Sequence, residues 1–459
     1  MSIHSKILIV LVLLLAVVLG AVAGGYYWTV ITYIKVDGIR YERNAAQLDL
    51  RGQKVSPEHH ENLQKALPDC KILWDVPFQQ GTCSSDTQKI TVTAIAQEDI
   101  QQLRYLPDLQ EVDATKCIDL PMVQKLQEAY PDLKVTYGVE IGGEILDMGT
   151  ESLNLDAGEG DFTQLMDRLA YLPQMKSIYF EEPELTADEL MQLQEAYPGI
   201  QMTWTKTVFG KPMSCDTEEL DISGMQFASV EEIEKQANYL TGLKKLTMCD
   251  TGFANEDIAA FRERARGRYK VVWNLKIGQI MVRTDDTWFM PTKLHLDVKD
   301  RDVQNLKYCE DMICIDLGHN VIKNIDWLRG TPHVKYLIIA DGPLREIDAI
   351  GTLKELKFLE LFMTDIRDIT PLLGCTALED LNVARIPASL RPLSEMKWLK
   401  NLWMSGGWVS REDEAFLRQE LPNTRIDAAH HHNCCGRGWR QIQNYYDMRD
   451  ILGMPYYLE

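Results

Sequence analysis

Residues 356–378, LKFLELFMTDIRDITPLLGCTAL, contain one complete copy of a motif that recurs along the C-terminal half of the chain. Within this copy, Leu359, Glu360 and Leu361 are apolar, polar and apolar, which is the pattern of a strand with one buried face. Successive copies are 22, 22, 22 and 21 residues apart, with triplets that begin at Ile315, Leu337, Leu359, Leu381 and Leu402. Because one such repeat cannot bury its apolar strand alone, the period predicts a stack of repeats with parallel strands.

Two further apolar positions accompany each triplet, and in the quoted copy they are Leu356 and Ile366. Together they form the frame L-x-x-L-x-L-x-x-N-x-L, and the chain here resembles the short 22-residue class of leucine-rich repeats. The segment Ile366 to Leu372 is particularly similar to internalin-like proteins, of the membrane-anchored Gram-positive bacterial kind. The resemblance implies an α/β solenoid with parallel strands on its concave face. The Asn of the frame occurs only as Asn320, so we expect a less regular array.

The N-terminal half contains a longer repeat. The sequence LQEAYP at residues 126–131 returns at residues 193–198, which is 67 residues further on. A strand with an aromatic residue follows each copy, and related strands carry Trp74, Tyr137, Trp204 and Trp273. Each unit of about 67 residues is therefore predicted to hold two strand–helix turns and a hairpin insertion, such as the one around Gly142-Gly143.

The first 34 residues contain the most apolar segment. Residues 7–23 carry no charge, and the apolar character resumes at Tyr26 and runs to Ile34. This length and the aromatic residues near its end favour an uncleaved transmembrane helix over residues 7–34. The alternative is a signal peptide, because Ala21-Val22-Ala23 has the small-x-small pattern of a cleavage site.

The orientation of this segment is indicated by two opposing signals. Lys35, Arg40 and Arg43 follow the segment, and by the positive-inside rule they favour a cytoplasmic C-terminal side. A short leader before an N-terminal apolar segment favours export instead. We expect export, with a single pass through the plasma membrane and extracytoplasmic repeats.

These patterns predict four parts. Residues 1–34 are the anchor or signal peptide, and residues 35–290 hold the long degenerate repeats with their hairpins. Residues 291–428 hold the repeats of about 22 residues, and residues 429–459 form a C-terminal cap that seals the open end of the array.

The charge of the chain limits its partners. The 68 acidic and 48 basic residues give a formal net charge of −20. Nucleic-acid binding rests on neutralising phosphates, so a nucleic-acid partner is not expected. The ten cysteines form no CxxC pair, and Cys70 and Cys83 flank one loop where a disulfide is conceivable only in an exported chain.

A His- and Cys-rich tract is the only weak metal candidate. It contains His430, His432, Cys434 and Cys435, but its spacing matches no established zinc site. The chain also lacks the GxSxG, GxxxxGK[ST] and GxGxxG motifs. We therefore predict a non-catalytic protein without a cofactor, with metal-dependent activity at this tract as the remote alternative.

The outward residues of the parallel strands are the candidate partner-binding positions. They are Asp316, Ile338, Glu360, Phe362, Asn382 and Trp403, with Trp408 just beyond. Large aromatic residues are enriched at binding hot spots. The alternative is that Phe362 or Trp408 packs beneath the C-terminal cap. The predicted function is recognition of a protein or a cell-wall glycan, and the alternative function is a structural spacer or assembly factor that uses the hairpin edge.

Overall fold

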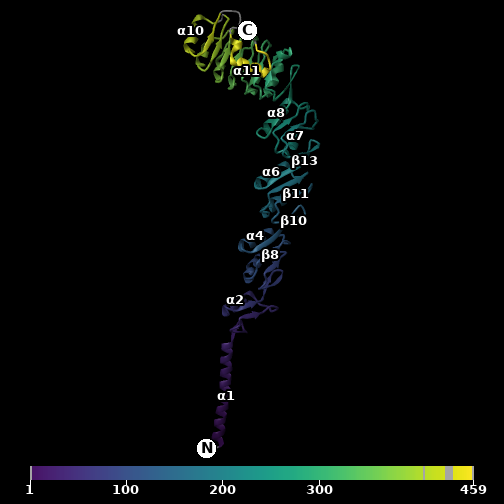
Figure 1. The fold of residues 1–459 in the computed structure, drawn as a ribbon, viewed down its shortest axis with the longest axis vertical. Helices are drawn as coiled ribbons and strands as arrows, with labels where there is room; N and C mark the ends of the chain where they lie inside the picture. Colours follow the sequence, from purple (N-terminus) through teal and green to yellow (C-terminus); the bar gives the residue numbers. More distant parts are fainter. Residues whose placement is uncertain (1–2, 407–408, 430–437, 457–459) are drawn as a thin grey trace. The chain divides into compact units, whose positions relative to one another are not determined.

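The computed structural model describes residues 3–406, 409–429 and 438–456, and the chain folds as two compact units, Met1–Thr205 and Lys206–Glu459 (Figure 1). The predicted positions Trp408, His430, His432, Cys434 and Cys435 lie outside the described residues.

The first unit begins with helix α1 (Ile3–Thr32), whose 30 residues correspond to about 45 Å of helix at 1.5 Å per residue. Its segment Leu8–Tyr26 has a mean hydropathy of 2.9 and buries none of its surface. Within the described part of the chain, this is the one helix long and apolar enough to cross a membrane. A signal sequence passes the same test, so the predicted anchor and its alternative both remain.

The remainder of the first unit alternates short strands and helices. Its helices are α2 (Pro57–Ala66), α3 (Gln97–Gln102), α4 (Leu120–Ala129), α5 (Phe162–Arg168) and α6 (Ala187–Ala196). Its strands are β1 (Tyr33–Val36), β2 (Ile39–Glu42), β3 (Gln47–Asp49), β4 (Lys71–Leu73), β5 (Asp75–Phe78), β6 (Gly81–Ser84), β7 (Lys89–Thr91), β8 (Glu111–Ala114), β9 (Lys134–Ile141), β10 (Glu144–Asp147), β11 (Ser152–Leu155) and β12 (Ser177–Glu181), and β13 (Gln201–Val208) ends in the second unit.

Each long repeat builds a small sheet of its own. Strands β7, β8 and β9 pair in parallel, and β10 turns back antiparallel to β9, which confirms the hairpin predicted around Gly142-Gly143. Strands β11, β12 and β13 form the next parallel set. Helix α6 has clear end signals: Thr186 and Glu189 form a reciprocal capping box at its start, and it ends just before Pro198.

The second unit opens with the last long repeat. It contains β14 (Lys211–Ser214), β15 (Glu219–Asp221), α7 (Val230–Ala237), β16 (Lys245–Thr247), α8 (Asn255–Ala265), β17 (Lys270–Val272), β18 (Asn274–Ile277) and β19 (Ile280–Arg283). Strands β15, β16 and β17 are parallel, and β18 and β19 form the hairpin predicted at this position.

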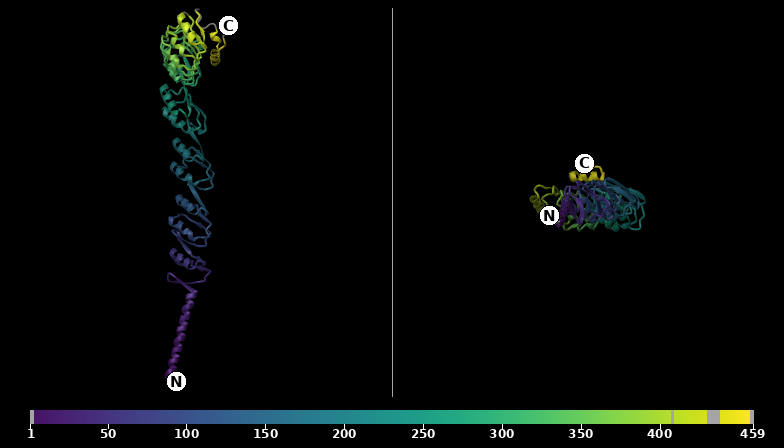
Figure 2. Two further views of the ribbon diagram at one scale, coloured as in Figure 1. Left: turned by 90° about the vertical axis from the view of Figure 1, so that its left-hand side faces the viewer. Right: turned by 90° about the horizontal axis from the view of Figure 1, so that it is seen from below.

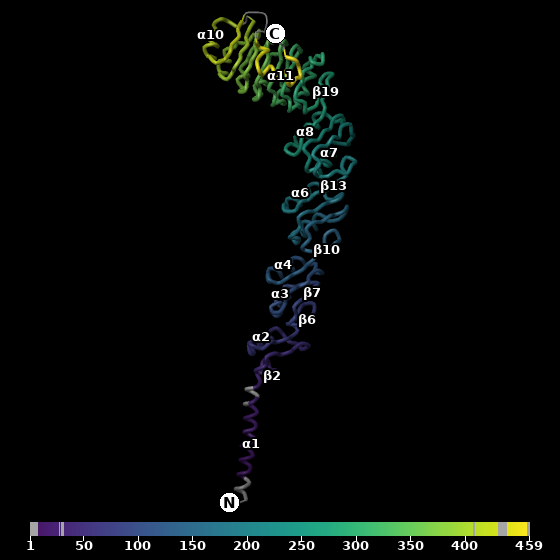
Figure 3. The backbone as a smooth tube through the Cα atoms, viewed as in Figure 1, coloured from purple at the N-terminus to yellow at the C-terminus, as the bar shows by residue number. Residues whose placement is uncertain are grey.

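The 22-residue repeats then form one parallel sheet of seven strands. They are β20 (Trp288–Phe289), β21 (Cys314–Asp316), β22 (Tyr336–Ile338), β23 (Phe358–Glu360), β24 (Asp380–Asn382), β25 (Asn401–Trp403) and β26 (Arg425–Asp427). The short helix α9 (Asp300–Val303) and 3₁₀ turns occupy the return segments of the repeats. The triplet residues Leu337, Leu359 and Leu381 pair with one another in register and are fully buried. The predicted repeat frame is therefore confirmed, and Figure 3 shows its successive coils.

One turn recurs after four successive strands of the array, β21 to β24. His319, Asp341, Met363 and Arg385 follow the strands at steps of 22 residues and all have a positive φ, between 56° and 63°. The backbone N–H groups of the first three donate to the next repeat at 2.9–3.0 Å, which holds this unfavourable conformation in place.

The expected irregularity of the array is not found at this turn. Asn320 accepts a hydrogen bond from the backbone N–H of Val298, in the neighbouring coil, at 2.8 Å. Thr364 takes the same position two repeats later, and its hydroxyl donates to the carbonyl of Leu361 at 2.8 Å. A hydroxyl therefore replaces the amide locally without disturbing the register.

Candidate binding surface on the concave strands

Five of the predicted binding residues form one row across the sheet. Each residue of this row is the register partner of the next, in the order Asp316, Ile338, Glu360, Asn382 and Trp403. We call these five residues the concave row. The row extends across five repeats because each member occupies the same place in its 22-residue coil.

The prediction that these side chains are exposed is wrong. Ile338 is 7% exposed and Glu360 3%, while Asn382 and Trp403 are completely buried. Phe362 is 6% exposed, and only Asp316 is half-buried. Their cover is the chain's own C-terminal segment, residues 438–456, which contains a 3₁₀ turn at Trp439–Gln441 and helix α11 (Gln443–Leu452).

The C-terminal segment therefore lies on the concave face rather than at the open end of the array. Figure 2 shows α11, in yellow, against the strands. The end of the array is covered instead by α10 (Arg411–Glu420) and β26, which continue the coil after β25. The expected cap at residues 429–459 thus corresponds, in its described part, to a cover over the strands. The alternative that Phe362 packs beneath this segment is confirmed.

An aromatic cluster joins the segment to the strands. The Trp439 ring stacks on Phe358 with ring centroids 5.1 Å apart, and it lies 5.6 Å from the Trp403 ring. Tyr445 contacts the same Phe358 ring at 6.1 Å. Trp439 is completely buried, so it is the central anchor of the contact.

Polar contacts fix the position of the segment. The indole N–H of Trp439 donates to Oε1 of Glu360 at 2.5 Å. The side-chain amide of Asn444 donates to Oδ2 of Asp380 at 2.8 Å and to Oε2 of Glu379 at 3.0 Å. These bonds add a donor from the C-terminal segment to each of the three carboxylates.

Burial also changes the protonation of two carboxyl groups on this face. Burial raises the pKa of Asp380, against the hydrogen bonds from Asn401 and Asn444. Burial likewise raises the pKa of Asp316, against the hydrogen bond from the backbone N–H of Gly318. Both groups therefore hold a proton more readily than an exposed aspartate does.

Sequence reasoning missed the partners of the row. Asp380 and Phe358 belong to the same strands but were not selected, and Trp439, Asn444 and Tyr445 were assigned to an end cap. A signal for the contact was present, because Tyr445, Met448 and Leu452 have helical spacing and share one buried face.

No metal cluster of three or more His, Cys, Asp or Glu residues occurs in the part of the chain that the structure describes. Cys70 and Cys83 are both free thiols. The predicted metal candidates in the His- and Cys-rich tract fall outside the described residues.

Comparison with known proteins concerns the fold alone. No protein-family model and no curated protein matches the chain. Internalin C2 of Listeria monocytogenes is 15% identical with a TM-score of 0.27, covering 49% of this chain and 88% of the internalin. A second Listeria monocytogenes internalin is 14% identical with a TM-score of 0.24, covering 80% and 88%. A leucine-rich-repeat protein of Leptospira interrogans is 15% identical with a TM-score of 0.27, covering 73% and 93%.

The chain's own geometry assigns its fold. Seven parallel strands, register steps of 22 residues from β21 to β24 and a turn repeated after four of the strands are the features of a stacked-coil array. The chain therefore has a leucine-rich-repeat fold.

Proposed function

We propose that the chain is a membrane-anchored, non-catalytic recognition protein that binds a protein partner through its concave row. The observation that carries this proposal is that the row already holds a peptide helix, the chain's own α11. Binding of an amphipathic helix in a groove is a common mode of peptide recognition. In the proposed mechanism, the C-terminal segment occupies the row until a partner with a similar helix replaces it.

The chemistry of the row supports a protein partner over a glycan. Phe358 stacks on the indole ring of Trp439, Trp403 contacts the same ring at a tilt, and Glu360 accepts its N–H. Aromatic anchors inside desolvated pockets carry much of the binding energy of protein interfaces. A cell-wall glycan is the other candidate ligand from the sequence, and no contact in the described residues favours it.

The hydrogen bonds of the carboxylates on the concave face support a non-catalytic role. Asp316 accepts from the backbone N–H of Gly318 at 2.9 Å, and Asp380 and Glu360 accept from the amide and indole groups described above. Each of these side chains is thus committed to a structural hydrogen bond. We propose no reaction at this face.

The long apolar helix α1 supports the proposed display of the array at the cell surface. Helix α1 runs unbroken through Ala21-Val22-Ala23 and is longer than the bilayer core of about 30 Å. We propose a single pass in the plasma membrane with the repeats outside. Protease digestion of intact cells, followed with an antibody to the C-terminal repeats, tests this topology. Loss of the signal with a retained membrane stub supports it, and a protected full-length chain contradicts it.

Two substitutions test recognition because they act in opposite directions. Trp439→Ala removes the anchor of the C-terminal segment and frees the row, so partner capture should increase. Trp403→Ala removes the surface itself, so capture should decrease even though the segment is also loosened. The measurement is quantitative cross-linking mass spectrometry on membranes of cells that produce each variant.

A matched control is Trp398→Ala, because Trp398 is a part-exposed tryptophan outside the concave cluster. It should leave the set of cross-linked proteins unchanged. Equal capture by Trp439→Ala, Trp403→Ala and the parent chain would contradict recognition through the row.

A second candidate function rests on the hairpins. Ile145 in β10 is 68% exposed and Met281 in β19 is 57% exposed. Apolar side chains at exposed hairpins favour a spacer or assembly role through the hairpin edge. Ile145→Ser and Met281→Ser should then abolish capture while Trp403→Ala leaves it intact, which is the reverse of the first proposal.

A further inference from the structure

The four long repeats contain equivalent hairpins, and their register allows position-by-position comparison. Cys83 pairs with Val76 in the first hairpin, as Leu146 pairs with Val139 in the second and Val282 with Leu275 in the fourth. Sequence spacing places Met213 at the same position of the third. The first repeat therefore carries a short thiol side chain where the other repeats carry Leu, Met or Val.

The other apolar positions around Cys83 are also less well covered in the first repeat. Phe78 is half-buried, whereas its hairpin equivalents Ile141 and Ile277 are 1% and 0% exposed. On the following strand segment, Val92 is half-buried, whereas its equivalent Leu155 is 2% exposed. The positions that correspond to Phe78 and Val92 are thus buried in other repeats, whereas these two side chains leave apolar surface uncovered in the first.

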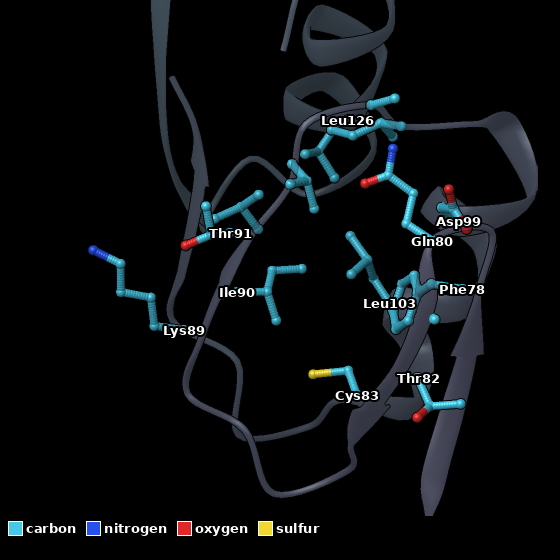
Figure 4. A pocket seen from close by; sticks show the side chains of 15 residues that line it. Phe78, Gln80, Thr82, Cys83, Lys89, Ile90, Thr91, Asp99, Leu103 and Leu126 are labelled. Carbon is cyan, nitrogen blue, oxygen red and sulfur yellow. The ribbon is translucent and has the colours of Figure 1, made fainter. Parts of the chain in front are cut away.

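The uncovered surface encloses a cavity of about 320 Å³ between the β5–β6 hairpin and strand β7. Figure 4 shows Ile90, Leu103 and Cys83 around the same space, with the Cys83 sulfur directed into it. The ammonium group of Lys89 points away from this space in Figure 4, and it is paired with Glu111 at 2.7 Å. Most of the cavity wall is therefore apolar. The buried Asp99 also lines it, and its carboxylate accepts from the backbone N–H groups of Gln79 and Ala96.

We propose that this cavity binds a single aliphatic chain of a small molecule or lipid. Its volume reaches the range of about 300–1,000 Å³ that is typical of small-molecule sites. It is about twice the roughly 150 Å³ of an engineered apolar cavity that holds benzene. The ligand replaces the apolar contacts that Leu146 and its equivalents supply in the other repeats. This site is separate from the concave row and does not depend on the proposed recognition function.

The first test uses the thiol in the cavity as a reporter in the unaltered chain. The full chain in lipid nanodiscs is alkylated with N-ethylmaleimide, with and without decanol, and rates are measured by peptide mass spectrometry. Decanol should slow alkylation of Cys83 at least tenfold. Cys249, the other half-buried thiol among the described residues, is the internal control and should change less than twofold. Equal slowing at both thiols, or none at Cys83, would overturn the proposal.

The second test fills the cavity. Cys83→Leu introduces the side chain of the second repeat, and it should reduce equilibrium binding of radiolabelled decanol at least tenfold. Cys249→Leu is the matched control and should bind like the parent chain. Unchanged binding by Cys83→Leu, with circular dichroism confirming its fold, would overturn the proposal.

A third measurement distinguishes binding of the ligand's alkyl chain from binding of its head group. Decanoate and decanol should bind within about threefold of one another, because the apolar chain makes the contacts. Binding of decanoate without binding of decanol would assign the affinity to the carboxylate and would contradict an aliphatic site.

Discussion

The long repeats and the 22-residue repeats both bury apolar parallel strands, but they arrange these strands in different sheets. In the 22-residue array, β20 to β26 form one continuous parallel sheet. In the long repeats, a hairpin follows every second turn, and the parallel strands occur in separate sets such as β7–β9 and β15–β17. A regular short coil therefore builds one broad surface, whereas an inserted hairpin divides the ladder into modules.

This difference also determines where apolar surface remains uncovered. The 22-residue array has a continuous buried core, and the C-terminal segment covers its concave face. The first long repeat has a cavity instead, because its hairpin supplies Cys83 rather than a larger side chain. The two regions should consequently differ in their response to core substitutions.

The largest expected effect is on core packing in the short array. Leu359→Ala removes a completely buried side chain and should cost about 4 kcal/mol of local stability. Ile90→Ala removes a half-buried side chain beside the cavity and should cost about 1 kcal/mol. Amide hydrogen exchange of the strands on either side of each site measures both costs. Equal costs would show that the two regions are equally well packed.

The next effect concerns the cover of the concave face. Trp439→Ala removes the ring between Phe358 and Trp403 and leaves Glu360 buried without its indole donor. Docking of α11 should weaken by about 3 kcal/mol. Hydrogen exchange of α11 amides should accelerate, while exchange of the long-repeat helices should not. Tyr456→Ala, which alters a 46% exposed side chain of the same segment, is the control.

A smaller effect is expected at the helix caps. Thr186→Ala removes the hydroxyl that accepts from the backbone N–H of Glu189 at 3.2 Å, which is one half of the capping box at α6, and should cost about 1 kcal/mol. Ser410→Ala at α10 should cost a similar amount, because the Ser410 hydroxyl accepts from the backbone N–H of Asp413 at 3.0 Å. The matched replacements Thr186→Ser and Ser410→Thr keep the hydroxyl and should retain stability in thermal unfolding. A loss with these hydroxyl-retaining variants would exclude the caps as the cause.

The smallest expected effect is the pH dependence of local stability, which should have opposite signs at Asp380 and at Asp285. Burial raises the pKa of Asp380 above its unfolded value, so its contribution to α11 docking is complete in acid and is lost as pH rises through the raised pKa. At Asp285, burial also acts to raise the pKa. Hydrogen bonds from Arg283 and Lys245 outweigh it and hold the pKa well below its ordinary value. The contribution of Asp285 is therefore present above the unfolded pKa and is lost only in stronger acid.

Hydrogen exchange, corrected for intrinsic rates, distinguishes these signs. Between neutral and mildly acidic pH, α11 should become more protected, and the strands around Lys245 and Arg283 should not change. Asp380→Asn should reduce the pH dependence of α11, and Asp316, whose pKa burial also raises, should account for the remainder. Weaker protection of α11 in mild acid would contradict the role given to Asp380.

Most of the repeat fold was predictable because its signal is local and periodic. The triplets at 22-residue steps became β21 to β25, and the register placed the concave row as the spacing predicted. Hairpins were also recognisable, because Gly142-Gly143 supplies the positive φ values that a tight turn requires.

The cover of the row was not predictable with the same certainty because it depends on contacts between distant residues. Trp439 and Glu360 are 79 residues apart in sequence, and no period connects them. Outward-facing aromatic residues such as Phe362 and Trp403 are compatible with both a partner surface and an internal contact. The helical spacing of Tyr445, Met448 and Leu452 was the one local sequence feature that indicated packing of this helix against another apolar surface.

The central claim is that the concave row is a binding site for a helix, and a peptide supplied in trans tests it most directly. The chain carrying Trp439→Ala is titrated with a synthetic peptide of residues 438–456 in a calorimeter. The account predicts one site per chain with a Kd on the order of 1 μM, and loss of binding when Trp403→Ala and Glu360→Gln are added. Absence of binding by the Trp439→Ala chain, or equal binding after the row is altered, would contradict it.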